Sequence, residues 1–263
     1  MIDHSEMLGH EALNSLGKRA ICFNLISALN RDSFPSLDKI GLSFRTPKRG
    51  PELTFVCEYI QSCLLPIPQG QSITIFLEPK INSCFPDIVI IYWDNVVAKN
   101  RSKHRSQLRK NDIRLLHYIA IAGPVQLDEM KPFFTSGIEG SLTRLCDANL
   151  IKNDSGVWQT EPLEDIFAIR RLIAIEAKID EWRTGLNQAH QNTWFSSESY
   201  LLMPQIPKGS SLMGEATKLG VGVLSRHQDL DSSEIAPRRD RIPKSYASWL
   251  FNEWVCMMNS FVC

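Results

Sequence analysis

The chain has 263 residues, enough for one large α/β domain or for a core with a small second domain. Its 29 basic and 29 acidic residues cancel, which excludes a general coat of positive charge for nucleic acid, so any polyanion site has to be local. The 43% hydrophobic content is ordinary for a soluble fold with a sizeable core.

Seven cysteines are scattered along the chain, without a Cys-x-x-Cys pair or a Cys/His spacing suited to zinc. We interpret them as reduced thiols, which predicts a cytoplasmic protein. The N-terminus carries Asp3 and Glu6 where a secretory signal has a basic start and an apolar core. An apolar stretch over 246–263 contains Asn252 and Glu253, which favours a docked amphipathic helix over a membrane span.

The first predicted element is a helix up to about Asn30, with apolar residues three or four positions apart. A connection over 31–50 contains two prolines. A second helix begins at Glu52 and stops at Pro66. Glu58 lies within this helix, next to its apolar stripe.

Two strands are expected next, over 72–77 and 86–93. The second strand, PDIVIIYW, is too apolar to have an exposed face and is therefore predicted to be central in a sheet. Its single acid is Asp87, at its very start; taken alone, this is a strand-capping residue beside a turn. The Glu-Pro-Lys sequence over 78–80 makes a poor rigid site, because it contains a proline in a turn.

One local concentration of positive charge follows over 99–110, KNRSKHRSQLRK, without any acid. Such a run is usually a solvated linker, but it can also lie along a phosphate backbone, where each contact releases counterions. Its basic residues are Lys99, Arg101, Lys103, Arg105, Arg109 and Lys110.

A compact helical unit is predicted after this run. Asp112 caps a first helix that ends at Gly123, and two further helices are expected over 127–134 and 136–150. A hairpin turn over 153–156 completes the unit. Three helices followed by a β-wing resemble a winged helix-turn-helix.

The third helix of this unit is the expected recognition helix. It offers Arg144 to a phosphate or a base, but it also carries Glu139 and Asp147. Because these acids oppose phosphate binding, contact with a protein or a spacer role stays open beside DNA binding.

The apolar β pattern returns over 166–179, where alternation places Glu176 and Lys178 on the same face of one strand. These two residues are either a chemical pair or only the solvated face of a strand. The remaining elements are a helix to about Gln191, a strand over 199–203, a short helix over 213–218, a strand over 220–224, a loop over 228–244 and the C-terminal helix.

With the helical unit removed, the order is helix, strand, strand starting with Pro-Asp, strand carrying Glu-x-Lys, helix, strand. This order and these residues resemble the PD-(D/E)xK nuclease superfamily, which has the restriction-endonuclease-like fold. The matching residues are Asp87, Glu176 and Lys178, with Glu58 on the preceding helix and Gln188 on the following one. The resemblance covers roughly 52–93 and 171–224.

One motif of the superfamily is incomplete. In the subset with Gln-x-x-x-Tyr, the position of the tyrosine holds Asn192 in this chain.

The resemblance implies a site for Mg²⁺ or Mn²⁺, which prefer hard oxygen ligands. Asp87 and Glu176 are the expected metal ligands, with the carbonyl of Ala177, and Glu58 binds directly or through water. Lys178 is expected to orient or deprotonate the attacking water and to steady the developing charge. Gln188 is expected to position the lysine or a phosphate.

The predicted fold is therefore α/β, a restriction-endonuclease-like mixed sheet flanked by helices with an inserted winged helix-turn-helix. The expected division is a first part of the nuclease core over 1–98, the insert with its basic linker over 99–163, and the rest of the core over 164–263. The predicted function is metal-dependent DNA cleavage in restriction or anti-phage defence. The alternatives are a non-catalytic DNA-binding or regulatory protein, and a subunit of a larger assembly. DNA is the expected partner. A homodimer or a protein partner bound through the insert is also expected, and a membrane is not.

Overall fold

The computed structural model describes residues 20–22, 40–41, 44–45, 48–63, 65–82, 85–134 and 136–259. Most of the predicted N-terminal helix lies outside these residues. Within it, Ala20–Cys22 forms strand β1, so the helical prediction is wrong for these three residues. The strand arises from tertiary pairing that local periodicity does not contain, because its backbone lies parallel to β2, Gln71–Leu77.

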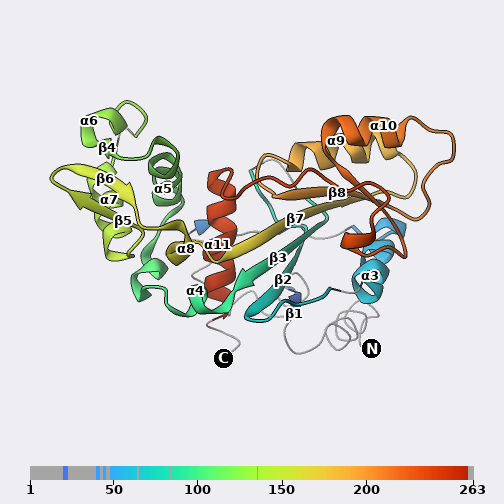
Figure 1. Cartoon of the computed structure of the whole chain (residues 1–263), viewed down its shortest axis with the longest axis horizontal. Helices are drawn as coiled ribbons and strands as arrows, with labels where there is room; N and C mark the ends of the chain where they lie inside the picture. Colours follow the sequence, from blue (N-terminus) through green and yellow to red (C-terminus); the bar gives the residue numbers. More distant parts are fainter. Residues whose placement is uncertain are drawn as a thin grey trace.

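A mixed sheet of six strands, in the order β1-β2-β3-β7-β8-β9, forms the main layer (Figure 1). Strand β3 is antiparallel to both β2 and β7, whereas β7, β8 and β9 run parallel to one another. The strands after β2 are β3, Ile88–Asp94; β7, Ile169–Ala177; β8, Glu198–Met203; and β9, Gly222–Ser225. The fold is thus α/β with a mixed sheet, as expected from the apolar runs.

Helices cover both faces of this sheet. Helix α3, Pro51–Ser62, packs its Phe55 and Tyr59 against one face of the central strands. On the other face, α9 (Trp182–Asn192) and α10 (Leu212–Leu219) cover β8 and β9. Helix α11, Tyr246–Asn259, covers β2, β3 and β7 on that same face. Because strand side chains alternate, even-numbered positions of β7 point toward the α9 and α11 face.

Helix α11 differs from the predicted amphipathic helix, because every residue over 247–256 is buried. One side of the helix packs on Phe76 and Trp93 of the sheet, and the other contacts α5, Lys110–Ala122. The helix is therefore buried on all sides, and its polar Asn252 and Glu253 make hydrogen bonds in the interior. In the part of the chain that the structure describes, no helix has the length and apolar character needed to cross a bilayer.

The segment between β3 and β7 forms a second, three-stranded sheet in the order β4-β6-β5 (Figure 1). Its elements are α5; β4, Val125–Gln126; α6, Leu127–Met130; α7, Ile138–Asp147; β5, Ile151–Asp154; and β6, Val157–Thr160. Helix α5 begins earlier than predicted. Asp112 lies in its first turn and accepts a hydrogen bond from Arg109 N at 2.8 Å.

The basic run over 99–110 is structured, which corrects the linker prediction. It comprises the end of α4 (Asn95–Lys99), the 3₁₀ helix η3 (Lys103–Gln107) and the start of α5. Short helix α8, Leu163–Ile166, then leads into β7. The run is rigid because Arg105 is drawn into the interior.

Arg105 and Glu253 form a buried ion pair between η3 and α11. Their side chains are 4% and 1% exposed, and Arg105 Nη1 lies 3.1 Å from Glu253 Oε1. Arg105 Nη2 also donates to Ile166 O, and Asn252 Nδ2 donates to Glu253 Oε1. The pair therefore joins the basic run, α8 and α11.

Removing one partner of this pair leaves a buried charge uncompensated. We expect Arg105→Met to lower the free energy of unfolding by about 3–5 kcal/mol, measured by urea denaturation. The double variant Arg105→Met/Glu253→Leu should recover most of that loss, because apolar groups of similar volume replace both charges. A single variant within about 0.5 kcal/mol of wild type would contradict a structural role for the pair.

Candidate active site at one edge of the main sheet

Asp87 and Glu176 lie opposite each other on neighbouring strands. The antiparallel register pairs Ile88 with Ile175, which places Asp87 just before β3 beside Glu176 near the end of β7. Ala177 N donates to Asp87 Oδ2 at 2.8 Å, and the two carboxyl groups are within hydrogen-bonding reach of each other. Ala177 thus contributes its N–H group in this structure, whereas the sequence analysis assigned a role to its carbonyl.

The two carboxyl groups repel each other in a poorly solvated site. Burial raises the pKa of Glu176 well above its usual value, and the charge of Asp87 raises it further. Burial also raises the pKa of Asp87, against the lowering effects of the Ala177 N–H group and of Lys178. Groups this close titrate as a pair, so the pair retains a proton to higher pH than either carboxyl group would alone.

Lys178 follows Glu176 on the same side of the strand. Its side chain is 15% exposed, and its Nζ lies 3.3 Å from Glu52 Oε1 on α3. A Cβ atom at Gly185 of α9 would lie 2.5 Å from Lys178 Cγ and 2.6 Å from Leu201 Cδ1. Gly185 therefore allows α9 to pack directly over the lysine, a role that the sequence analysis missed.

Asn192 is a second residue that the sequence analysis did not assign to the site. It is 1% exposed, and its Nδ2 donates to Glu176 Oε1 at 2.7 Å. It stands at the tyrosine position of the incomplete Gln-x-x-x-Tyr motif. The available signal was a polar residue one helical turn after Gln188.

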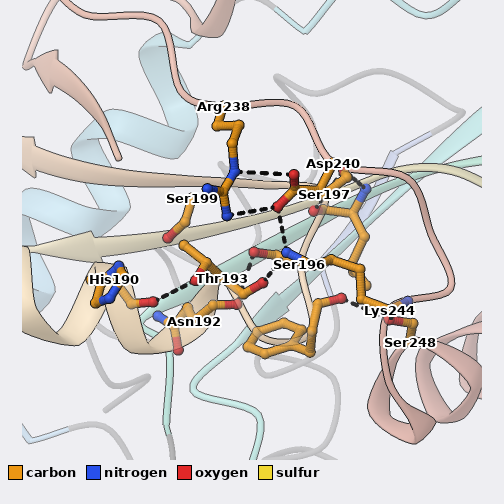
Figure 2. Close-up of polar contacts among 12 residues, drawn as sticks. His190, Asn192, Thr193, Ser196, Ser197, Ser199, Arg238, Asp240, Lys244 and Ser248 are labelled. Atoms are coloured by element: carbon orange, nitrogen blue, oxygen red, sulfur yellow. Dashed lines mark hydrogen bonds and ion pairs between the residues drawn. The ribbon is translucent and has the colours of Figure 1, made fainter. Parts of the chain in front are cut away.

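A polar network holds the end of α9, and thereby Asn192 (Figure 2). Ser196 Oγ donates to Asn192 O at 2.9 Å. Lys244 Nζ donates to Thr193 O and pairs with Asp240. This network fixes the donor that orients Glu176.

Gln188 lies one turn before Asn192 on α9. Its Oε1 atom is buried and has no hydrogen-bond partner among the described residues. An unsatisfied amide oxygen on α9 is an acceptor available to a lysine, a water or a cation.

Glu58 does not join the carboxyl pair through any contact of the described residues. Its half-exposed carboxylate pairs with Arg226 Nη2 at 3.3 Å. Glu52, nearly two turns earlier on the same helix, is the acid that contacts Lys178. Glu52 and not Glu58 is therefore the α3 acid beside the site.

Glu78, which the sequence analysis set aside, lies next to Asp87. Its backbone N–H group donates to Asp87 O at 3.1 Å, and its charge contributes to the raised pKa of Asp87. Its carboxylate pairs with Arg45. The hairpin register of β2 and β3 produces this proximity, which the proline-containing sequence did not indicate.

The predicted phosphate contacts are partly corrected. Arg105 is buried against Glu253, and Arg144 donates to both oxygens of Asp112 at 2.8 and 2.7 Å. Both guanidinium groups are therefore already engaged by carboxylates. The other basic residues of the run stay accessible to differing degrees: Lys99, Lys103 and Arg109 are exposed, and Arg101 and Lys110 are half-buried.

The donor set at the pair fits a hard divalent cation. Asp87 and Glu176 both present carboxylate oxygens, the kind of ligand that Mg²⁺ and Mn²⁺ require. No group of three or more His, Cys, Asp and Glu side chains suited to a metal occurs in the described part of the chain. A cation at this position would therefore keep several water ligands, as Mg²⁺ usually does.

Comparisons of the chain with protein-family models, with curated proteins and with solved structures find no significant match.

The raised pKa values make stability depend on pH in a defined direction. Between the carboxyl pKa of an unfolded chain, about 4, and the raised value of the folded pair, the native state binds more protons than the unfolded state. The free energy of unfolding therefore falls as pH rises through this window. The protonated carboxyl pair makes its full contribution to stability only below the window. Urea denaturation at a series of pH values in EDTA measures the slope.

Glu176→Gln should flatten that slope and stabilise the metal-free protein above the window. Each unit of raised pKa corresponds to about 1.4 kcal/mol. Glu164→Gln, at an exposed carboxyl group of α8, is the matched control and should leave the slope in place. An unchanged slope in Glu176→Gln would show that the pair does not titrate as described.

Proposed function

We propose that this protein is a metal-dependent DNA endonuclease of the PD-(D/E)xK type. The observation that carries the proposal is the joining of Asp87 and Glu176 across β3 and β7, with Lys178 directly after Glu176. Buried carboxyl groups with raised pKa values are typical of functional sites, because burying them lowers the stability of the fold.

The order of elements supports the same proposal. Helix α3, strands β2 and β3, strand β7, helix α9 and strand β8 follow in the order expected from the superfamily, once the segment between β3 and β7 is set apart. We propose that this segment, with α5, α6, α7 and the hairpin β5–β6, is a winged helix. Its exposed residues Lys99, Lys103 and Arg109 are the candidates for contact with the DNA backbone.

Each residue of the site has a distinct role in this proposal. Asp87 and Glu176 would hold the cation, which when bound would supply positive charge beside the scissile phosphate. Asn192 keeps Glu176 Oε1 directed into the site. Lys178 accepts or donates a proton at Nζ and offsets negative charge on the phosphate, and Glu52 holds it in place. The resemblance suggests a role in restriction or anti-phage defence, and the scattered cysteines, interpreted as reduced thiols, favour the cytoplasm.

Plasmid cleavage in Mg²⁺ is the direct test. We expect wild type to nick or linearise supercoiled DNA, and Asp87→Asn, Glu176→Gln and Lys178→Met each to lower the rate at least about 100-fold. Lys218→Met, an exposed lysine of α10, is the matched control and should cleave as wild type does.

Equal cleavage by wild type and the three site variants would exclude this site. DNA binding that persists in EDTA, without any scission in Mg²⁺ or Mn²⁺, would favour the alternative of a non-catalytic DNA-binding protein.

A second role for the insert is favoured by its surface. Ile121 is 70% exposed and Phe133 is 68% exposed. They lie by a groove of about 360 Å³ between α5 and Tyr246. We propose that a second copy of the chain covers this surface, because a two-fold contact would bring the exposed apolar residues of both copies together and remove them from water.

Light scattering tests this contact. We expect wild type to be dimeric at micromolar concentration, and Ile121→Glu/Phe133→Glu to be monomeric, since a charge opposite its own copy repels. Leu163→Glu, at an exposed apolar residue elsewhere on the described surface, is the control. A monomeric wild type would contradict the proposal.

A further inference from the structure

We infer that a hollow at the carboxyl ends of β8 and β9 binds a nucleotide of the DNA strand that flanks the scissile phosphate. This inference rests on the proposed endonuclease function and adds a substrate subsite to it. The hollow encloses about 550 Å³. Its walls are Pro204, Gln205 and Ile206 after β8, and Ser225, Arg226 and His227 around the end of β9.

The sheet register places this hollow beside the carboxyl pair. Ala177 pairs with Leu202, which pairs with Leu224, so the ends of β7, β8 and β9 lie at one edge. Two strand spacings of about 4.8 Å separate the backbone of Lys178 from that of β9. A distance of roughly 10 Å is short enough for a nucleotide close to the one cleaved beside Lys178 to reach the hollow.

Arg226 is suited to a phosphate at the rim of this hollow. Its guanidinium group lies 5.4 Å from the ring centre of the buried Phe55, which holds it at the edge. Among the described residues its ion-pair partner is Glu58 at 3.3 Å, and both side chains are more than 40% exposed. An exposed pair of this kind contributes little, so a phosphate can replace Glu58 and engage the guanidinium in two hydrogen bonds.

The interior of the hollow favours a base rather than a second phosphate. Glu234 lines it, and its carboxylate accepts a hydrogen bond from Gln228 Nε2 at 2.8 Å. Gln228 is itself fixed, because its Oε1 accepts from Ser225 N at 2.8 Å. A fixed carboxylate repels phosphate but accepts hydrogen bonds from the exocyclic amino group of cytosine or adenine. Pro204 and Ile206 supply apolar surface against which a base can pack.

Two substitutions with opposite expected effects on DNA binding, one at Arg226 and one at Glu58, test the inference. Binding of a labelled 20-base-pair duplex is measured by fluorescence anisotropy in EDTA, so that binding is read without cleavage. Arg226→Gln should weaken binding about tenfold and reduce the slope of log K against log salt by about 1. Glu58→Gln should strengthen binding several-fold, because it frees Arg226; a metal-ligand role for Glu58 predicts no such gain.

Arg170→Gln is the matched control, since Arg170 forms an ion pair of the same length with Asp94 at the opposite edge of the sheet. Binding by Arg226→Gln that equals wild type, while wild type cleaves DNA in Mg²⁺, would overturn the subsite and leave the proposed function standing. Loss of binding in Arg226→Gln with no cleavage by wild type would keep Arg226 as a DNA contact, but it would overturn the nuclease proposal and with it a subsite beside a scissile phosphate. A wild type that neither binds nor cleaves the duplex would overturn both.

Discussion

The contact on which the site depends is that of two carboxyl groups, held together by the antiparallel register of β3 and β7. Burying two like charges costs free energy, which Ala177 N, Asn192 and Lys178 partly offset, and Arg45 Nη2 lies 4.0 Å from Asp87 Oδ1. The groups stay together because sheet hydrogen bonds on either side fix their backbones. The hydrogen bonds and packing of the sheet thus offset the unfavourable free energy of the buried carboxyl pair. Scaffolds commonly stabilise functional sites in this way.

The register survives a long insertion because the insert is part of the core. Residues of α5, α7, α11 and the main sheet form one continuous hydrophobic cluster. The pair Arg105–Glu253 and the hydrogen bonds of Asn252 join the entry and exit of the insert to α11. An insert anchored in this way holds the ends of β3 and β7 together, instead of pulling them apart.

Local sequence patterns contained most of the sheet. The apolar runs of β2, β3, β7 and β8 are long and uninterrupted, so their positions followed from the sequence, as did the candidates Asp87, Glu176 and Lys178. The pairing of β1 with β2 could not be predicted from the sequence, because a strand of three residues is too short to show a pattern of alternating apolar and polar residues.

The partners of charged side chains were equally inaccessible. Arg105 and Arg144 count as positive charge in a sequence, but each is engaged by an acid far along the chain, Glu253 and Asp112. Glu78 and Glu52 were not predicted to belong to the site. Tertiary contacts bring Glu78 beside Asp87 and Glu52 beside Lys178. Sequence reasoning identified the chemical groups, and only the fold showed which of them remain free.

The geometry of β7 sets how the two parts of the molecule can share one duplex. The insert leaves the sheet after β3 ends at Asp94 and returns before β7 begins at Ile169, whereas the carboxyl pair lies at the other end of the same strands (Figure 1). Strand β7 has nine residues and therefore spans roughly 30 Å at about 3.3 Å per residue. That length is close to one helical turn of B-DNA, about 34–36 Å. On the proposed function, the insert therefore contacts the duplex about one turn away from the cleaved phosphate. On that proposal the insert would position the DNA, while the residues at the carboxyl ends of β7, β8 and β9 would contact the strand that is cut.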